Sequence, residues 1–371
     1  MWCTISSSAP RHMSALLVFL LSSPAQAEDQ VAPPEGAPSS LLAVDGATVQ
    51  PYALLQLWLT AYDMDADAQA DATGYGDPED DEGLKVKSFK VGVGGEVKQW
   101  RYRLGVGSSA PYDGLSEPEE PIEVEDAWIG VVPVKGVKIQ VGNSKLPFSR
   151  DQLMSTGDLV FTERGIASEH LVPDRSLGLL ATFSRGGGTF SVGGFNAGGD
   201  LFGDSSRGKT VVGRLEWDVG KADTYATWGQ RKEFGLGVGA NAYYTIGEAT
   251  DTWAAGGDAM LRVAGLSVLV DGAFSRISPT ATTVASPEVF EETDRWGVTG
   301  QVSYQVGPVE PAVRFSMFDD STLGQYSHML AGGEWHTAED HIRLGAGYEL
   351  RLEGADAIDN DTARLWAQFR L

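Results

Sequence analysis

Three features are scarce in this chain of 371 residues: cysteines, long apolar runs and basic side chains. The 1 cysteine, Cys3, excludes a disulfide within the chain. The longest apolar run, within residues 14–21, is too short for a membrane-spanning helix. Basic residues (Lys+Arg 28) are outnumbered by acidic residues (Asp+Glu 51), and the formal net charge of -23 argues against a nucleic-acid partner.

The N-terminus carries the pattern of a secretory signal. Arg11 and His12 precede the apolar run, and small residues ending in Ala-Gln-Ala at 25–27 follow it. This order predicts a signal peptide at residues 1–27, and its cleavage would remove Cys3. The Pro-rich stretch that comes next predicts a flexible periplasmic segment at residues 28–48.

Apolar and polar residues alternate over most of the remaining chain. The last seven residues, Leu-Trp-Ala-Gln-Phe-Arg-Leu at 365–371, place apolar side chains on one face and Trp, Gln and Arg on the other. This period of two is typical of strands, and of membrane barrel strands that separate lipid from a wet lumen. The pattern predicts sixteen strands, at residues 49–62, 84–94, 99–108, 124–132, 137–145, 175–183, 189–196, 209–217, 234–246, 252–263, 266–277, 295–306, 309–318, 327–336, 341–352 and 362–371.

Tight turns and longer loops alternate between these strands. We therefore predict an all-β fold, a transmembrane antiparallel barrel of 16 strands over residues 49–371, in the outer membrane of a Gram-negative bacterium. Lipid and lipopolysaccharide would surround it. Residues 218–233 fit either a further strand or a long periplasmic connection. We favour the connection, because an even strand count places both termini in the periplasm.

The two predicted faces differ in chemistry. One carries apolar and aromatic residues, such as Trp100, Leu104, Val298 and Leu344, and should meet lipid. The other carries charged residues, with arginine the most frequent, so the lumen leans cationic although the protein is anionic. The acidic residues concentrate in two stretches, 63–82 and 113–125, which are predicted to be exposed loops.

The longest predicted loop, residues 146–174, mixes apolar side chains with arginines. Its apolar residues indicate that it packs against a wall, and folding inward would make it the narrowest part of the pore. Here the chain resembles the phosphate-selective porins O and P. The resemblance is carried by Asp126-Ala-Trp128, Gly142-x-x-Lys145-x-Pro147-Phe148, Ser155, Asp158-x-x-Phe161-x-Glu163-Arg164, Pro173-x-Arg175-x-x-Gly178, Gly257-Asp-Ala-Met260 and Gly265-Leu-Ser267.

This resemblance implies a trimeric 16-stranded porin with an inward-folded third loop and passage of anions. The chain departs from the family pattern in two ways. It ends in Leu371 instead of an aromatic residue, and it shows no dense lysine cluster of the kind that forms the family's phosphate site. We therefore expect a mild anion preference that is weaker than that of a dedicated phosphate pore.

Inward-facing and loop charges are the candidate pore-lining and constriction residues. Arginine suits such a path, because its planar fork binds phosphate or carboxylate without losing its charge. The alternative is that these side chains pair with lumen acids and stiffen the wall, and for Glu163-Arg164 a buried structural bridge is favoured. The candidates are Arg101, Arg103, Lys138, Lys145, Arg150, Glu163, Arg164, Arg175, Arg214, Arg314 and Arg343.

The function predicted from these patterns is passive diffusion of small solutes, with a mild preference for anions, phosphate among them. One alternative is a pore for neutral or cationic solutes gathered by the acidic loops. Another is a non-conducting barrel that acts as adhesin, scaffold or hydrolase. We expect no enzyme activity, because the adjacent Ser327 and His328 face opposite ways along a strand. No cofactor is implied.

A calcium site is not predicted either. The acidic spacing from Asp63 to Asp71 resembles part of a calcium-binding loop. However, Ala68 replaces the glycine of the sharp turn, and Gly74 replaces the closing glutamate.

Overall fold

The structure is a computed structural model. It describes residues 42–44, 46–62, 83–109, 122–197, 208–229, 233–247, 249–280, 292–322, 324–337, 341–352 and 361–371. The predicted signal peptide and the acidic stretch 63–82, with its calcium-like spacing, lie outside the described residues. So does the predicted lead-in, except for its last residues. Of these, Leu42–Val44 forms a short strand, β1, that pairs with the start of the first barrel strand.

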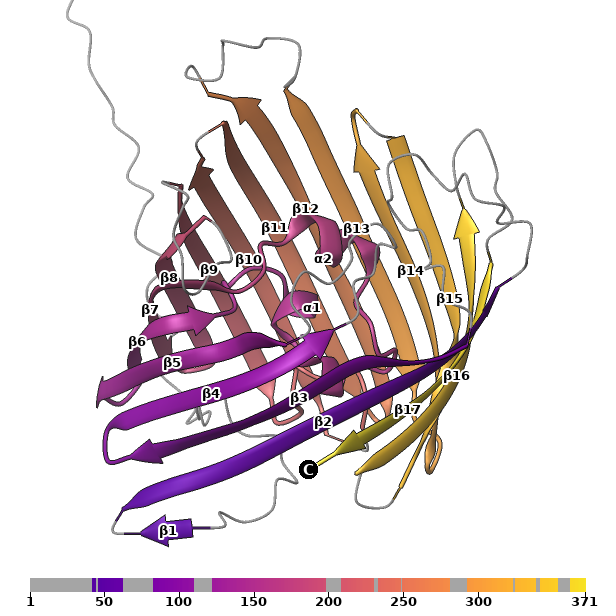
Figure 1. The fold of residues 1–371 in the computed structure, drawn as a ribbon, viewed down its shortest axis with the longest axis horizontal. Helices are drawn as coiled ribbons and strands as arrows, with labels where there is room; N and C mark the ends of the chain where they lie inside the picture. Colours follow the sequence, from indigo (N-terminus) through magenta and orange to yellow (C-terminus); the bar gives the residue numbers. More distant parts are fainter. Residues whose placement is uncertain are drawn as a thin grey trace, which may run out of the picture.

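Sixteen antiparallel strands close into a barrel, because the last strand pairs with the first (Figure 1). All sixteen predicted strands are present, so the predicted fold class is confirmed. They are β2 (Ala47–Tyr62), β3 (Gly83–Val97), β4 (Trp100–Ser109), β5 (Glu123–Val134), β6 (Val137–Ser144), β7 (Ser176–Arg185), β8 (Gly188–Asn196), β9 (Lys209–Gly220), β10 (Gly235–Ile246), β11 (Thr250–Val263), β12 (Leu266–Pro279), β13 (Thr293–Tyr304), β14 (Val309–Asp320), β15 (Gly324–His336), β16 (Ile342–Leu352) and β17 (Thr362–Arg370).

The strands present the two faces that their alternation predicts. On β13, Trp296, Val302 and Tyr304 are exposed on the outside, whereas Thr299 and Gln301 between them are buried inside. Trp296 and Tyr304 stand near opposite ends of the strand, as aromatic girdles do at the two membrane interfaces. The apolar surface therefore lies outside the barrel and the polar surface lines the lumen.

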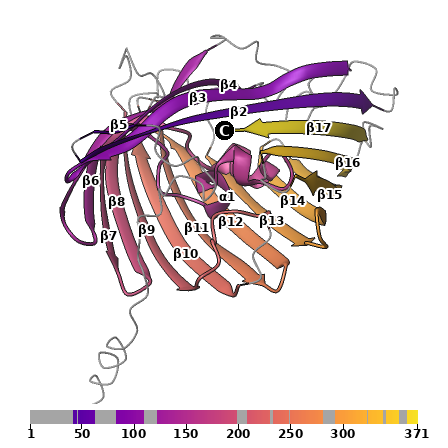
Figure 2. The same ribbon diagram turned by 90° about the horizontal axis from the view of Figure 1, so that it is seen from below.

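The segment after β6 folds into the lumen and crosses it (Figure 2). It contains two short helices, α1 (Arg150–Leu153) and α2 (Ile166–Leu171), and a 3-10 helix, η1 (Thr156–Asp158). Within the described residues, no helix is long and apolar enough to cross a membrane. We refer to residues 146–174 as the third loop, and its predicted inward fold is present.

Apolar packing and the carboxylate of Asp271 hold the first part of the third loop inside. Phe148, Met154 and Val160 are each 0% exposed and pack on inward-facing wall residues. At the start of α1, the carboxylate of Asp271 on β12 accepts hydrogen bonds from the backbone N–H groups of Arg150 (2.8 Å) and Asp151 (3.1 Å). These N–H groups have no partner within so short a helix, so the barrel wall supplies the helix cap.

Candidate solute passage

The candidate lumen residues fall into two groups that differ in exposure. Arg150 and Arg343 are 0% exposed, and Arg214, Arg314 and Glu163 are nearly as deeply buried. The remaining candidates keep partial exposure to the lumen, and they are Arg101, Arg103, Lys138, Lys145, Arg164 and Arg175. Solvent therefore reaches the second group and not the first.

Arg150 and Arg214 are buried in one ion-pair network. The Nε of Arg150 lies 2.8 Å from an Asp258 carboxylate oxygen, and Nη1 of Arg214 lies 2.5 Å from the other oxygen. Arg214 also donates through Nε to Glu216 at 2.8 Å. Since both guanidiniums are enclosed and paired, they hold α1 against β9 and β11.

Arg314 and Arg343 fasten the middle of the third loop. Glu163 accepts from Arg314 at 3.1 Å and from Arg364 at 2.9 Å, so one loop carboxylate bridges β14 and β17. Arg343 donates to the carbonyls of Gly157 (2.7 Å) and Leu159 (2.9 Å), and its charge is balanced by Glu334 at 2.8 Å. Breaking a buried pair of this kind on one side is costly, because it leaves an uncompensated charge.

The partly exposed charges gather beside β3, β4 and β5. Lys90 lies 2.6 Å from Glu125, and Arg103, whose side chain is 31% exposed, lies 3.1 Å from Asp126. Arg175, 18% exposed, reaches both carboxylates, at 3.5 Å and 3.4 Å. Three cations thus share two carboxylates on a wall that solvent reaches.

A tyrosine and two glycines support Arg103. The guanidinium of Arg103 stacks over the ring of Tyr52 at 4.5 Å from its centroid. That ring lies against Gly92 and Gly105, where an added Cβ would come within 2.4 Å and 2.0 Å of its atoms. Glycine at these two inward positions therefore allows the tyrosine to lie flat and to hold the arginine on the lumen side.

Three lysines that the sequence analysis did not single out complete this group. Lys85, Lys87 and Lys90 project from β3, and Lys87 lies within electrostatic range of Glu163, Glu169 and Arg164 of the third loop. A β-bulge opposite Gln56 and Leu57 places Lys87 as the extra residue of β3, so Lys85, Lys87 and Lys90 all face inward. These three lysines stand within six residues of the chain, so the sequence already places them together, and the bulge puts all three on one face of β3.

Lys145, directly after β6, and Arg164 of the third loop face the same group. The Nζ of Lys145 donates to the carbonyls of Gln152 (2.5 Å) and Met154 (2.7 Å), and Arg164 donates to Asp151 (3.1 Å) and Met154 (2.9 Å). These partners are neutral carbonyls at the end of α1, so they do not cancel the charge. We name the whole set the passage cluster, which consists of Lys85, Lys87, Lys90, Arg103, Lys145, Arg164 and Arg175.

Two candidates lie away from this cluster. Arg101 pairs with Glu96 at 2.8 Å and donates to the carbonyl of Lys98, close to the short β3–β4 turn. Lys138 lies over the ring of Trp128 at 5.5 Å, at the start of β6. Both therefore stand near the rim with the tight turns, which is the periplasmic side of such a barrel.

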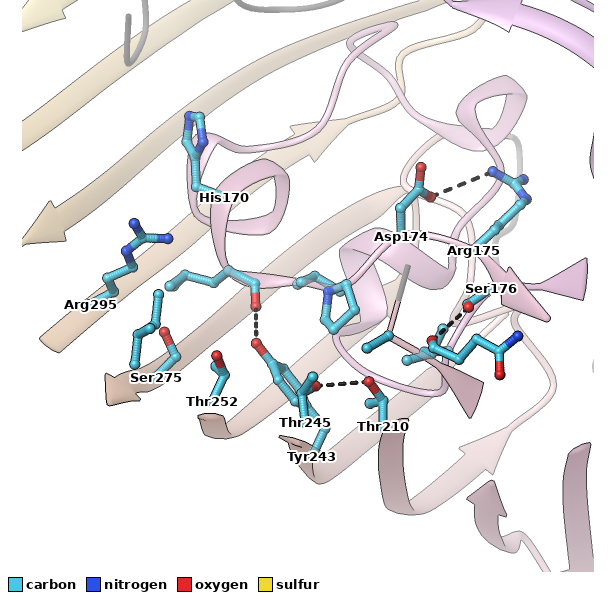
Figure 3. A pocket seen from close by; sticks show the side chains of 17 residues that line it. His170, Asp174, Arg175, Ser176, Thr210, Tyr243, Thr245, Thr252, Ser275 and Arg295 are labelled. Atoms are coloured by element: carbon cyan, nitrogen blue, oxygen red, sulfur yellow. Dashed lines mark hydrogen bonds and ion pairs between the residues drawn. The ribbon is translucent and has the colours of Figure 1, made fainter. Parts of the chain in front are cut away.

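A pocket of about 320 Å³ lies beside the two ends of the third loop, with Leu146 and residues 170–174 among its lining (Figure 3). Hydroxyl groups from neighbouring strands line it, and Thr210 and Thr245 hydrogen-bond to each other at 2.8 Å. Arg175 and Arg295 are also among its lining residues, and burial lowers the pKa of His170 to about 4, so this histidine is neutral at physiological pH. Since Arg175 also belongs to the passage cluster, pocket and cluster share one guanidinium.

Comparisons with known proteins agree with this architecture. The chain is similar to OmpT of Vibrio cholerae (TM-score 0.57, 12% identity, covering 89% of this chain and 99% of that chain). It is also similar to an anion-selective porin from Comamonas acidovorans (TM-score 0.60, 10% identity, 88% and 100%) and to Salmonella typhi OmpF in complex with daunomycin (TM-score 0.58, 12% identity, 88% and 98%). These similarities show the fold. A comparison with curated protein sequences gives no match.

A family model decides the assignment. The model of the phosphate-selective porins O and P matches residues 60–249, just over half of the chain. This range includes the passage cluster, most of the motifs on which the predicted resemblance rests, and the whole third loop. The chain therefore belongs to the phosphate-selective porin O and P family.

Proposed function

We propose that this outer-membrane porin passes small anions in preference to cations, along a path beside β3, β4 and β5. The family and the closed barrel make it a channel of the Gram-negative outer membrane. The finer points, which are the charge preference, the path and the solutes, are our proposal. Small hydrated anions, phosphate among them, are the solutes that this chemistry would favour.

One observation carries the proposal, and it is the excess of positive charge in the passage cluster. Its seven cations face five carboxylates, Glu125, Asp126, Glu163, Glu169 and Asp174. Two of the cations, Lys145 and Arg164, are held by backbone carbonyls. An ion that passes within a few ångströms of such a group feels a positive potential that bulk salt screens only in part.

The preference should be mild, because every carboxylate in this group lies close to a cation. Arg103 and Arg175 share Asp126, and Lys90 and Arg175 share Glu125. A dedicated binding site would leave the cations available to the solute alone. Partial pairing instead gives a path that favours anions while holding them weakly, as conduction requires.

The test is the reversal potential of single channels in a planar bilayer with a salt gradient. The wild-type protein should show a reversal potential on the anion side of zero. Arg103→Gln should move it toward cations, because this substitution removes one charge of the cluster while Arg175 still holds Asp126. Arg101→Gln is the matched control, because it lies on the same strand and face but pairs with Glu96 near the turn.

Two outcomes contradict the proposal. If the wild-type pore favours cations at every salt concentration, the acidic loops decide selectivity, and the protein is a pore for neutral or cationic solutes. If Arg103→Gln and Arg101→Gln shift the potential equally, ions do not follow the cluster. Phosphate added to chloride solutions provides a further measurement, since a solute that enters the same path reduces the chloride current.

We also propose a homotrimer without catalytic activity. One of the similar solved structures, OmpT of Vibrio cholerae, is described as a trimer form, and the family resemblance implies the same assembly here. Light scattering of the detergent-solubilised protein, corrected for bound detergent, would give a mass of three chains. A single-chain mass, or hydrolysis of ester or peptide probes by the purified protein, would contradict these two points.

A further inference from the structure

The connection between β9 and β10 differs from the other periplasmic connections. Most of those are tight turns, such as residues 98–99, 135–136 and 264–265. Residues 218–233 were the segment for which the sequence left a strand and a connection open. In the structure β9 continues to Gly220, and a connection follows it. Residues 221–229 of this connection, which we name the strap, turn inward and contact the barrel wall and the third loop.

The side chain of one arginine on the barrel wall binds the backbone of the strap. Arg262 of β11, 1% exposed, donates to the carbonyls of Ala226 (2.7 Å), Trp228 (2.8 Å) and Gly229 (3.1 Å). On the far side, Glu310 of β14 accepts from the N–H of Gly229 at 3.0 Å. A fifth hydrogen bond runs from Arg262 to the carbonyl of Asp223 at 3.3 Å. A peptide held by five hydrogen bonds to two buried charged side chains is not a solvated turn.

The strap also binds the third loop directly. The N–H of Thr227 donates to the carbonyl of Asp158 at 2.9 Å, and the N–H of Val160 donates to the Thr227 hydroxyl at 2.9 Å. Trp228 packs on the apolar cluster that contains Val160 and Phe161, and it carries Arg343 over its ring at 4.6 Å. Strap and loop therefore form one packed body inside the barrel.

Tyr225, in the middle of the strap, contacts the third loop and the wall. Its ring lies under the guanidinium of Arg150 at 4.5 Å, and its hydroxyl donates to Glu216. The same ring packs against the apolar cluster of Met154, Leu159, Met260 and Leu269. Inward-facing wall residues behind the strap are consequently dry, with Met260 at 0% and Leu269 at 1% exposure, whereas Arg103 on the opposite wall is 31% exposed at its side chain.

We propose that the strap seals the periplasmic part of the lumen along β9–β15 and confines solutes to the passage cluster beside β3–β5, which makes the strap a determinant of selectivity. This inference rests on the proposed function for the location of the path. Behind the strap stand four arginines and five carboxylates, namely Arg150, Arg214, Arg262, Arg343, Glu216, Asp218, Asp258, Glu310 and Glu334. A solute that entered there would meet a slight acidic excess.

The experiment removes the strap. In a variant that lacks Asp223–Trp228, single-channel conductance should rise by about twofold or more, because a second part of the lumen becomes wet. The reversal potential should also shift toward cations, because the newly wetted wall has no cationic excess. Arg262→Met, which removes the strap's main anchor without shortening the chain, should give frequent transitions to the same larger conductance.

The matched control is Arg185→Met, the same exchange at an exposed arginine at the periplasmic end of β7. This variant should leave the single-channel conductance and the reversal potential unchanged. Folding of each variant is checked by heat-modifiable mobility on gels, so that a collapsed barrel is not counted. Unchanged conductance in a folded strap deletion overturns the proposal, and so does unchanged selectivity with raised conductance.

These outcomes separate the strap from the proposed function. A wild-type pore that is not anion-selective contradicts the proposed function, yet a strap deletion that raises its conductance still supports a sealed part of the lumen. An anion-selective wild-type pore whose strap deletion behaves like the parent supports the passage cluster and overturns the strap.

Discussion

A charge placed on the lipid face of β13 tests the face assignment quantitatively. Val298 lies six residues before the end of the strand at Tyr304, and its neighbours across the sheet are Gly272 and Met317. With a rise of about 3.4 Å per residue and a tilt of about 40°, Val298 stands roughly 15 Å from that end, near the middle of an apolar band about 25 Å tall. Val298→Arg should therefore cost about 2–4 kcal/mol in the free energy of unfolding.

Leu344 provides the comparison for this test, because it also faces lipid but lies close to one end of its strand. It lies only two residues from the start of β16, roughly 5 Å above the periplasmic end, so Leu344→Arg should cost about 1 kcal/mol or less. The assay is urea unfolding in lipid vesicles, followed by tryptophan fluorescence. Val298→Met controls for side-chain length. Equal costs for the two arginine variants, or no cost for Val298→Arg, would refute the orientation of the wall.

Three further predictions concern the lumen. Glu163→Gln should cost about 3–5 kcal/mol in unfolding free energy, because it leaves the buried Arg314 without its carboxylate and leaves Arg364 only the longer pair with Glu349 at 3.7 Å. Glu96→Gln at an exposed pair should cost at most about 1 kcal/mol, and equal losses in urea unfolding would contradict this prediction. Deletion of residues 151–165 should raise single-channel conductance and weaken solute discrimination, and an unchanged conductance in a folded variant would count against the third loop as the constriction. His170 has its pKa lowered by burial to about 4 from an ordinary 6.5, so its contribution to stability is full above pH 6.5 and is lost as the pH falls toward 4. His170→Gln should flatten that part of the stability–pH curve, and an unaltered curve would show that this histidine is not buried in its neutral form.

The alternation of apolar and polar residues was sufficient to predict the sixteen strands of the barrel wall and their two faces. The period of two is set by the covalent geometry of a strand, so it survives in the sequence whatever the neighbours are. Strand ends were predicted less well. β3 continues to Val97, beyond the predicted end at Gly94, because register with residues 47–49 of β2 extends the pairing through Gly95 and Glu96, where no apolar alternation remains.

The sequence predicted which side chains face the lumen, but it did not predict how deeply each of them is buried. Arg150 and Arg343 were expected inside the barrel, and they are there, yet their complete burial depends on the third loop and the strap, which arrive from distant parts of the chain. Lys85 and Lys87 carried a usable signal, since they alternate with Leu84 and Val86. Lys90 has the opposite parity, and only the bulge at Lys87, which no local pattern reveals, turns it to the same face.

The anchors of the two inner segments have a consequence for the order of assembly. The third loop is tied to Arg343, which follows its partner Gly157 by 186 residues, and the strap is tied to Glu310, which follows Gly229 by 81 residues. Contacts so distant in sequence form late, since the intervening chain must be ordered before they can be made. The wall must therefore be built through β16 before all of these anchors are in place, although Asp271 of β12 and Arg262 of β11 can hold the two segments earlier. A barrel that stalled before its last strands were inserted would hold the third loop only by its contacts with earlier strands such as β12, and completing the C-terminal strands adds the bonds of Arg343 to the middle of the loop.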